Sequence, residues 1–193
     1  MKTDIASDIR AVVELTAADH KELDELYVRC FGPPGQRPPH PLTVAGSDDV
    51  RYIVRVWEDG KDSGNDILVS CLYLDERDIL IDGRPTRTVG IRGVRTDPTY
   101  RRRGFGTAAM QRAAAFIWEH LHPKLAMLHS SEMAVPFYRS LGWRAVDGPV
   151  TCEQPAGRVN LTEMLPANPI MVLLRPTGGV MPQGPIDLCG LPW

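Results

Sequence analysis

Residues 94–107 of this 193-residue chain read Val-Arg-Thr-Asp-Pro-Thr-Tyr-Arg-Arg-Arg-Gly-Phe-Gly-Thr, and this stretch decides the fold. Its apolar start predicts a strand, Asp97-Pro98 predicts a sharp turn, and the glycines open a long helix. Gly104 and Gly106 carry no Cβ, so the main chain can approach a ligand closely. Free N–H groups at the start of a helix, with arginines beside them, suit a pyrophosphate.

The hydrophobic pattern changes its period at this stretch. Before it, alternation predicts a meander of antiparallel strands over residues 9–15, 52–57, 67–74, 79–81 and 86–96. Thr16 is expected to cap a helix with Asp19 as its third residue, and Asp82-Gly83 to form a two-residue type I′ turn. After it, helices over 104–121 and 134–141 alternate with strands over 124–128 and 170–174. The expected fold class is α+β, or mixed α/β, with a mostly antiparallel sheet and flanking helices.

Composition favours one soluble domain. Hydrophobic residues make up 43% and charged residues 24%, and the net charge of −2 excludes a strongly charged disordered chain. No apolar run reaches the roughly 20 residues of a membrane helix, and the first residues contain acids where a signal peptide is apolar. We expect a cytoplasmic protein with a single domain over residues 1–193, in which residues 177–193 form a tail beside the acceptor site. Cysteines 30, 71, 152 and 189 lack metal-ligand spacing and are expected to be core thiols, with no metal.

Charge is distributed unevenly along the chain. Residues 84–112 hold eight arginines and one acid, Asp97, whereas the rest of the chain holds 14 basic and 23 acidic residues. This pattern predicts two ligands of opposite sign, one polyanionic and one cationic. Two familiar phosphate motifs do not fit, because no Gly-Lys-Ser/Thr occurs and Ala109 stands where a dinucleotide fingerprint needs its third glycine.

The segment resembles the central motif of the GNAT superfamily of acyl-CoA-dependent N-acyltransferases, Arg/Gln-x-x-Gly-x-Gly/Ala, here Arg101-x-x-Gly104-x-Gly106. A second family feature follows as Pro-Phe-Tyr-Arg-Ser-Leu-Gly-Trp over residues 136–143, and the resemblance covers roughly residues 90–146. It implies acetyl-CoA as donor, held by main chain and side chains of one contiguous segment. The residues it implies for the coenzyme are Val94, Arg95, Thr96, Arg101, Arg102, Arg103, Gly104, Phe105, Gly106 and Thr107.

The resemblance also implies that Tyr138 lies near the thioester sulfur. Acetyl transfer to an amine needs an acid for the leaving thiolate, and a phenol with an unperturbed pKa of about 10 keeps its proton at neutral pH. Tyr138 is therefore the candidate acid, and a core tyrosine is the alternative.

A narrower resemblance concerns the acceptor. Gly142-Trp143, Gly148-Pro149 and the final tryptophan are similar to the aminoglycoside 2′-N-acetyltransferases, in which the end of the chain and nearby acids bind a polycationic sugar. Carboxylates are the groups that ammonium ions need. The acceptor-site candidates are Asp48, Asp49, Glu163, Asp187 and Trp193.

Two positions depart from that branch. Arg92 stands where its members keep a glutamate, so the general base is open among His129, Glu132 and Glu163, and a histidine titrates in a suitable range. Leu191 replaces an acid near the end, which indicates a less cationic substrate. The small branch that acetylates kasugamycin, an aminoglycoside with fewer amino groups, fits this departure.

Alternatives remain open at this point. The acceptor could instead be a protein N-terminus, a lysine or a polyamine, or the chain could be a silent acyl-CoA sensor. A nucleic-acid-binding module is disfavoured because the arginines gather around one strand-helix unit and the total charge is negative. The expected partner is a small cationic amino sugar, with neither nucleic acid nor membrane, and a homodimer is left open.

Overall fold

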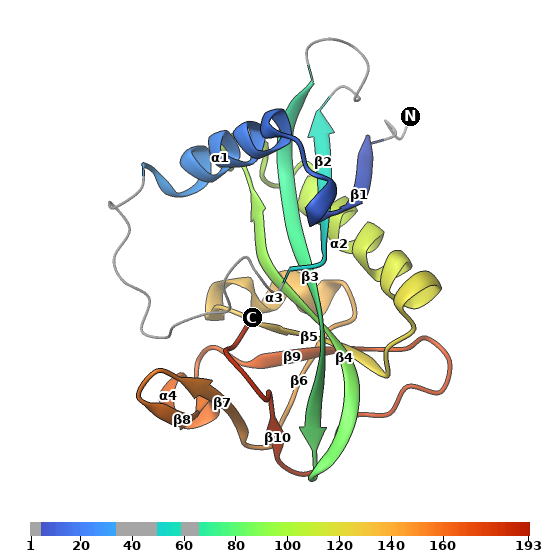
Figure 1. Ribbon diagram of the computed structural model, residues 1–193, viewed down its shortest axis with the longest axis vertical. Helices are drawn as coiled ribbons and strands as arrows, with labels where there is room; N and C mark the ends of the chain where they lie inside the picture. Colours follow the sequence, from blue (N-terminus) through green and yellow to red (C-terminus); the bar gives the residue numbers. More distant parts are fainter. Residues whose placement is uncertain (1–4, 34–49, 59–65) are drawn as a thin grey trace. The chain divides into compact units, whose positions relative to one another are not determined.

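The computed structural model describes residues 5–33, 50–58 and 66–193 (Figure 1). These residues form two compact units. The described part of unit 1 covers residues 5–33, 50–58, 66–74 and 93–115, and that of unit 2 covers residues 75–92 and 116–193. Strands β3 (Ile67–Ile81) and β4 (Arg84–Thr96) contribute residues to both units.

In unit 1, β1 (Ser7–Ala11) pairs antiparallel with β2 (Tyr52–Glu58), which pairs antiparallel with β3. A 3₁₀ turn, η1 (Val12–Glu14), leads to α1 (Ala17–Phe31), so the strand expected over residues 9–15 begins and ends earlier. The helix starts with the predicted capping box of Thr16 and Asp19 and ends at Gly32, whose φ is 80°. Figure 1 shows α1 lying along β2 and β3, and a buried cluster joins them: Leu23, Leu26, Ile53, Trp57, Leu68 and Cys71.

A buried ion network fixes the start of α1 in unit 1. The Arg55 guanidinium is fully buried and donates to both carboxylate oxygens of Asp8, at 3.0 and 2.8 Å, and also to Asp19. It also lies over the Trp57 ring, 4.9 Å from the centroid. Burial alone would raise the pKa of Asp19, but hydrogen bonds from Thr16 and Arg55 outweigh it and lower that pKa below its ordinary value.

Replacing Arg55 by methionine is expected to destabilise the protein by about 3 kcal/mol, because it leaves two carboxylates without their buried partner. The loss is measured by urea unfolding at pH 7. The lowered pKa of Asp19 means that its share of the stability is complete above pH 4 and disappears as the pH falls. The Arg55→Met variant should therefore lose less stability on acidification than the parent protein. A variant as stable as the parent at pH 7 would contradict this account.

Unit 2 is built on a sheet in the order β6-β9-β5-β4-β3-β10-β7-β8. Its further strands are β5 (Leu125–His129), β6 (Arg144–Ala145), β7 (Val150–Gln154), β8 (Gly157–Asn160), β9 (Ile170–Leu174) and β10 (Ile186–Asp187). β4 with β5 and β7 with β10 are parallel, whereas β5–β9, β6–β9, β7–β8 and β3–β10 are antiparallel. The predicted mixed α/β class with a mostly antiparallel sheet is confirmed.

Local turn predictions are confirmed as well. Asp82 and Gly83 have φ values of 50° and 71°, as a type I′ turn requires at both central residues. The helix after the glycines is α2 (Phe105–Phe116), continued by one π turn, η4 (Ile117–Leu121), and stopped at His122. The later helix is α3 (Val135–Ser140), preceded by the 3₁₀ turn η5 (Glu132–Ala134) and followed by Gly142 with φ 87°.

Three expectations need correction. β3 is one 15-residue strand rather than two shorter runs, because the charged residues 75–78 continue the strand. The segment 144–165 and the tail contain β6, β7, β8, α4 (Leu161–Met164) and β10, which the sequence pattern did not predict. Cys189 is exposed rather than a core thiol, whereas Cys71 and Cys152 are buried. The stretch 32–47, which is rich in proline and could be a lid over the acceptor or a connector, lies outside the described residues from residue 34 onward.

Candidate active site

The turn between β4 and α2 in unit 1 has the geometry of an anion cradle. Asp97 caps the 3₁₀ turn η3 (Pro98–Tyr100), accepting hydrogen bonds from the Thr99 N–H at 2.9 Å and its hydroxyl at 2.7 Å. Arg102 and Gly104 then take positive φ values of 62° and 92°, which turn the chain into α2. The first intrahelical hydrogen bond runs from Ala108 N to Gly104 O, at 2.9 Å. The N–H groups of residues 105–107 therefore have no carbonyl of the helix as partner and can bind an anion.

The three consecutive arginines of this turn are all exposed, but they are held differently. Arg101 donates to the Thr96 carbonyl at 3.3 Å. Arg103 pairs with Glu58 and lies over the Tyr100 and Phe105 rings, 5.0 and 5.5 Å from their centroids. Within the described part of the chain, a Cβ added at Gly104 would meet one atom within 4 Å, the Ile5 methyl at 3.9 Å. Glycine backbone, helix start and exposed guanidinium groups thus fit the pyrophosphate of a coenzyme.

Strand β4, which leads to the turn, is unpaired along part of the side that faces β5. β4 pairs with β5 only over Thr88–Gly90, so in the described strand pairings its residues from Ile91 onward are unpaired on that side. The main chain of Val94 and Thr96, which the resemblance implies to hold acetyl-CoA, lies in this part of β4. The Thr96 hydroxyl contacts the Ser70 hydroxyl at 2.9 Å.

Arg95 differs from the other coenzyme candidates. Its guanidinium donates to the Tyr73 hydroxyl at 2.9 Å and lies 5.8 and 5.3 Å from the ring centroids of Tyr27 and Tyr73. The side chain of Arg95 thus contacts Tyr27 on α1 and Tyr73 on β3. Its main chain is the part that could contact a coenzyme. Arg92 is half-buried at the position where a glutamate was expected.

Tyr138 lies on α3 in unit 2 and is 7% exposed. Its ring meets Trp143 edge-on with 6.2 Å between centroids and is tilted against Phe137 at 5.2 Å. Burial raises the pKa of Tyr138 to about 12. The phenol therefore holds its proton throughout the neutral range, as a hydrogen-bond donor to a developing negative charge must.

Two of the base candidates share one partner in unit 2. His129 ends β5, and its Nε2 lies 3.0 Å from the Asn168 carbonyl oxygen, while the Glu132 N–H donates to the Asn168 side-chain oxygen at 3.1 Å. The Glu132 carboxylate is on the surface. Asn168 thus brings these two residues together. The third candidate, Glu163, is exposed on α4.

The remaining acceptor candidates are placed as follows. Asp187 on β10 pairs with Arg158 at 2.6 Å, so its charge is already compensated. Asp48 and Asp49 lie outside the described residues.

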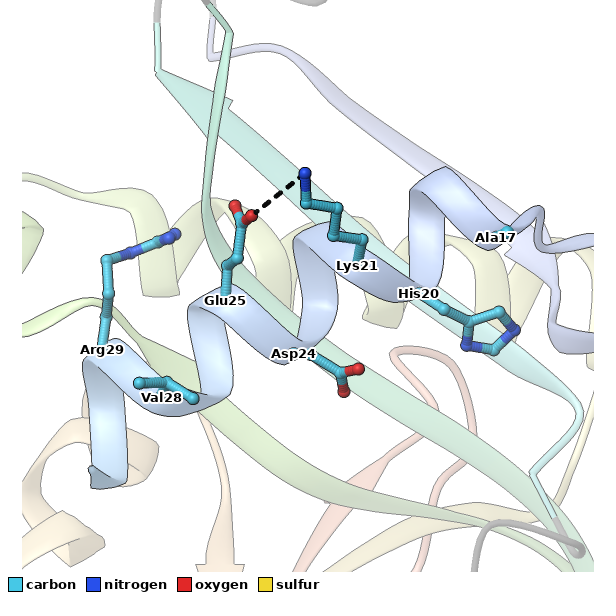
Figure 2. Close-up of a pocket in the computed structure, with 7 residues that line it drawn as sticks. All are labelled: Ala17, His20, Lys21, Asp24, Glu25, Val28 and Arg29. Atoms are coloured by element: carbon cyan, nitrogen blue, oxygen red, sulfur yellow. Dashed lines mark ion pairs between the residues drawn. The ribbon is translucent and has the colours of Figure 1, made fainter. Parts of the chain in front are cut away.

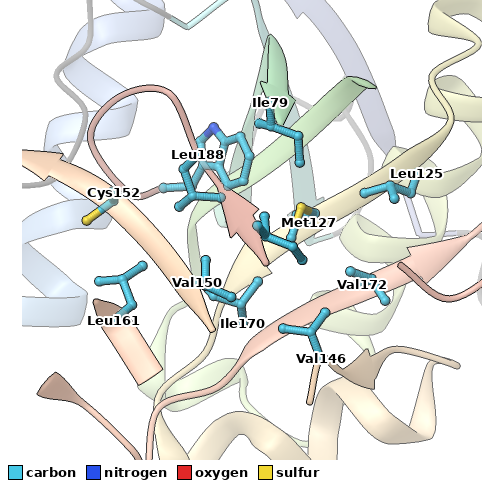
Figure 3. Close-up of a cluster of buried hydrophobic side chains, with 12 residues drawn as sticks. Ile79, Leu125, Met127, Val146, Val150, Cys152, Leu161, Ile170, Val172 and Leu188 are labelled. Atoms are coloured by element: carbon cyan, nitrogen blue, oxygen red, sulfur yellow. The ribbon is translucent and has the colours of Figure 1, made fainter. Parts of the chain in front are cut away.

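Trp193 lies in the core of unit 2 rather than on its surface. It is 6% exposed and belongs to a buried cluster that Figure 3 shows converging from β3, β5, β7 and β9. Its indole N–H donates to Asp75 at 3.0 Å, and the Arg77 guanidinium lies 5.1 Å from the ring centroid. Arg77 also donates to the Leu191 carbonyl at 2.8 Å. The end of the described chain is thus fixed by its side chain, and Asp75 and Arg77 are its anchors.

Sequence reasoning missed Asp75 and Arg77. The only signal was their place in a charged run, residues 75–78, between two apolar strand patterns. Such a run is ordinarily a solvated surface, yet Asp75 is 2% exposed.

An open hollow follows one face of α1 (Figure 2). Its volume is about 830 Å³, and it is lined by Ala17, His20, Lys21, Asp24, Glu25, Val28 and Arg29. Lys21 pairs with Glu25 at 3.9 Å, and Arg29 pairs with Asp97 at 2.6 Å. Both strong cations of the hollow therefore already have a carboxylate partner, whereas the exposed Asp24 adds a negative charge. No feature of the sequence pointed to this helix face.

Comparison with known proteins identifies the family of the chain. A family model described as an acetyltransferase (GNAT) domain matches residues 11–146. The chain therefore belongs to the GNAT family of acetyltransferases, and acetyl-CoA is its co-substrate. No curated protein matches the chain.

Solved structures share the fold at low sequence identity. Escherichia coli ElaA is 19% identical, covering 87% of this chain and 98% of that one, with a TM-score of 0.58. The GNAT family N-acetyltransferase YhbS from Escherichia coli, in complex with CoA, is 13% identical. The match covers 100% of this chain and 98% of that one, with a TM-score of 0.58. Arabidopsis thaliana NAA60, in complex with a bisubstrate analogue, is 12% identical. The match covers 88% of this chain and 99% of that one, with a TM-score of 0.54.

Two further observations concern metals and membranes. Among residues 5–33, 50–58 and 66–193, no three His, Cys, Asp or Glu side chains gather in a group that could hold a metal ion. None of the helices in these ranges has the length and apolar character needed to span a membrane.

Proposed function

We propose that this acetyltransferase modifies an amino group of a cationic amino sugar, an aminoglycoside antibiotic of the kind acetylated at a 2′-amino group, and so confers resistance. The observation that carries the proposal is the α1 hollow. The hollow is open to solvent, and all seven residues that line it are exposed, so a hydrated, polar ligand suits it better than an apolar one. Its strong cations are already paired, and Asp24 offers a carboxylate to an ammonium group.

Acetyl-CoA supplies the acetyl group as an activated thioester. The backbone N–H groups of residues 105–107, with Arg101 and Arg102, hold its phosphates. Tyr138 keeps a proton on its phenol oxygen at neutral pH and, as the general acid, gives it to the thiolate that leaves, while the proton lost by the attacking nitrogen restores the phenol. His129 or Glu132 accepts the proton that the acceptor ammonium must lose before its nitrogen can attack. Glu163, Asp187 and Trp193 remain proposed contributors to the acceptor site, as do Asp48 and Asp49.

A thiol-release assay with acetyl-CoA tests the proposal. Kasugamycin and other aminoglycosides form one arm, and spermine and peptides with free amino termini form the others. Asp24→Asn is expected to raise KM for the aminoglycoside about 5-fold, because one charged contact is lost. Glu119→Gln, in unit 2, is the matched control and should leave that KM unchanged. Turnover of peptides alone would exclude the amino-sugar acceptor.

The rival acceptor is a protein or peptide amine. NAA60, whose structure contains a bisubstrate analogue, shares only the fold with this chain at 12% identity, so it gives no preference between acceptors. The assay decides between them, because a peptide acceptor would be turned over in the peptide arm while kasugamycin and the other aminoglycosides would not.

A further inference from the structure

A single side chain links α1 to the coenzyme turn inside unit 1. Arg29 lies in the last turn of α1, and its Nε donates to the Asp97 carboxylate at 2.6 Å. Its Nη2 donates to the Leu68 carbonyl of β3, also at 2.6 Å. Because the planar guanidinium makes both bonds at once, its position is set by the helix and by the strand together.

Asp97 uses its other contacts to start the turn. It is 2% exposed, its N–H donates to the Val69 carbonyl at 2.9 Å, and its second carboxylate oxygen accepts both hydrogen bonds from Thr99. Four residues later the chain reaches Arg101, and the N–H groups for the pyrophosphate follow. The orientation of the Asp97 carboxylate thus sets the path of the chain into the anion cradle.

The charge of Asp97 needs compensation at this depth. A buried carboxylate is costly unless it is paired and hydrogen-bonded. Burial would raise the pKa of Asp97, but the Thr99 hydrogen bonds and the Arg29 guanidinium outweigh burial and lower it. Among the described residues, Asp97 forms an ion pair with Arg29.

We propose that Arg29 is a positioning residue for acetyl-CoA: by holding the Asp97 carboxylate, it keeps residues 97–104 in the conformation that aims the N–H groups of α2 at the coenzyme. Arg29 need not touch the coenzyme, because it acts through Asp97. Nothing in the family's central motif, which begins at Arg101, includes this residue. The proposal concerns the donor side and is independent of which amine is the acceptor.

Titration calorimetry with CoA tests the proposal. Arg29→Ala is expected to raise the Kd for CoA about 10-fold, equivalent to about 1.4 kcal/mol. Arg29→Lys keeps the charge but loses the planar guanidinium that makes two hydrogen bonds at once. Its Kd for CoA is therefore expected to lie between those of the parent protein and Arg29→Ala. Arg87→Ala removes an arginine that pairs with Glu76 in unit 2 and should leave the Kd unchanged.

A double-mutant cycle shows whether Arg29 acts through Asp97. Asp97→Asn retains an oxygen for Thr99 and removes the charge, so it should weaken CoA binding as Arg29→Ala does. The Arg29→Ala/Asp97→Asn pair should then bind CoA no more weakly than Asp97→Asn alone. Additive losses, or an unchanged Kd in folded Arg29→Ala or Arg29→Lys protein, would overturn the proposal.

Limited trypsin digestion gives an independent readout. The turn contains three consecutive exposed arginines, residues 101–103, and a loosened turn is cleaved faster there. Arg29→Lys should therefore be cleaved at residues 101–103 several-fold faster than the parent protein, with cleavage in unit 2 unaltered. A general rise in cleavage across both units would show global destabilisation and would contradict a local role.

Discussion

Tyr138→Phe is expected to lower kcat about 100-fold, the effect typical of losing a positioned general acid. The substitution removes only the phenolic oxygen, so the contacts of the ring with Phe137 and Trp143 remain. The affinity for CoA should stay unchanged, because the implied role concerns the leaving sulfur and not the phosphates. Steady-state thiol release gives kcat, and calorimetry gives the affinity.

The pH profile provides the control for this prediction. Because burial raises the pKa of Tyr138 to about 12, the phenol stays protonated up to pH 10. Any decline of kcat below pH 10 therefore comes from another group and should persist in the Tyr138→Phe variant. If kcat of this variant lay within 3-fold of the parent value, Tyr138 would be a packing residue.

Gly90→Ala is expected to destabilise the protein by about 3 kcal/mol or more. A Cβ at Gly90 would lie 2.0 to 2.3 Å from three indole atoms of Trp193, closer than atoms can approach. The indole must leave its site, which costs the hydrogen bond to Asp75 and the packing of a large buried side chain. Urea unfolding followed by tryptophan fluorescence measures the loss.

A second substitution checks the cause. In Trp193→Ala the space in front of Gly90 is empty, so Gly90→Ala/Trp193→Ala should be no less stable than Trp193→Ala alone. If the two losses were additive, the glycine would be required by its own backbone and not by the indole.

The anchoring of Trp193 makes a deletion of the chain end a poor test of acceptor binding. Deleting residues 191–193 would remove a core side chain and the Leu191 carbonyl that Arg77 holds, so a loss of turnover would not separate folding from acceptor binding. Trp193→Phe retains an aromatic ring in the cluster and is the sharper variant.

Features set by neighbouring residues were predictable from the sequence. The capping box needs only Thr16 and Asp19, and the hairpin turn needs only Asp82-Gly83, so composition and spacing suffice. The turn between β4 and α2 was predictable for the same reason, since its glycines and the start of the helix are contiguous.

Features that depend on distant partners were not predictable. β6 and β10 have two residues each and exist because β9, β3 and β7 lie beside them. The burial of Trp193 depends on Asp75, 118 positions earlier, and on the missing side chain of Gly90. The link from Arg29 to Asp97 spans 68 positions and belongs to no local pattern.

The position of β10 late in the sequence has a consequence for folding during synthesis on the ribosome. β10 inserts between β3 and β7, so the central part of the sheet in unit 2 is open until residues 186–187 have emerged. Until then, the cluster that includes Ile79 and Val150 lacks Ile186, Leu188 and Trp193, and its apolar surface is accessible to chaperones. Pairings so distant in sequence also close slowly. During synthesis there is thus a period in which residues 94–107 are already complete while the nascent protein is still exposed to aggregation and proteolysis.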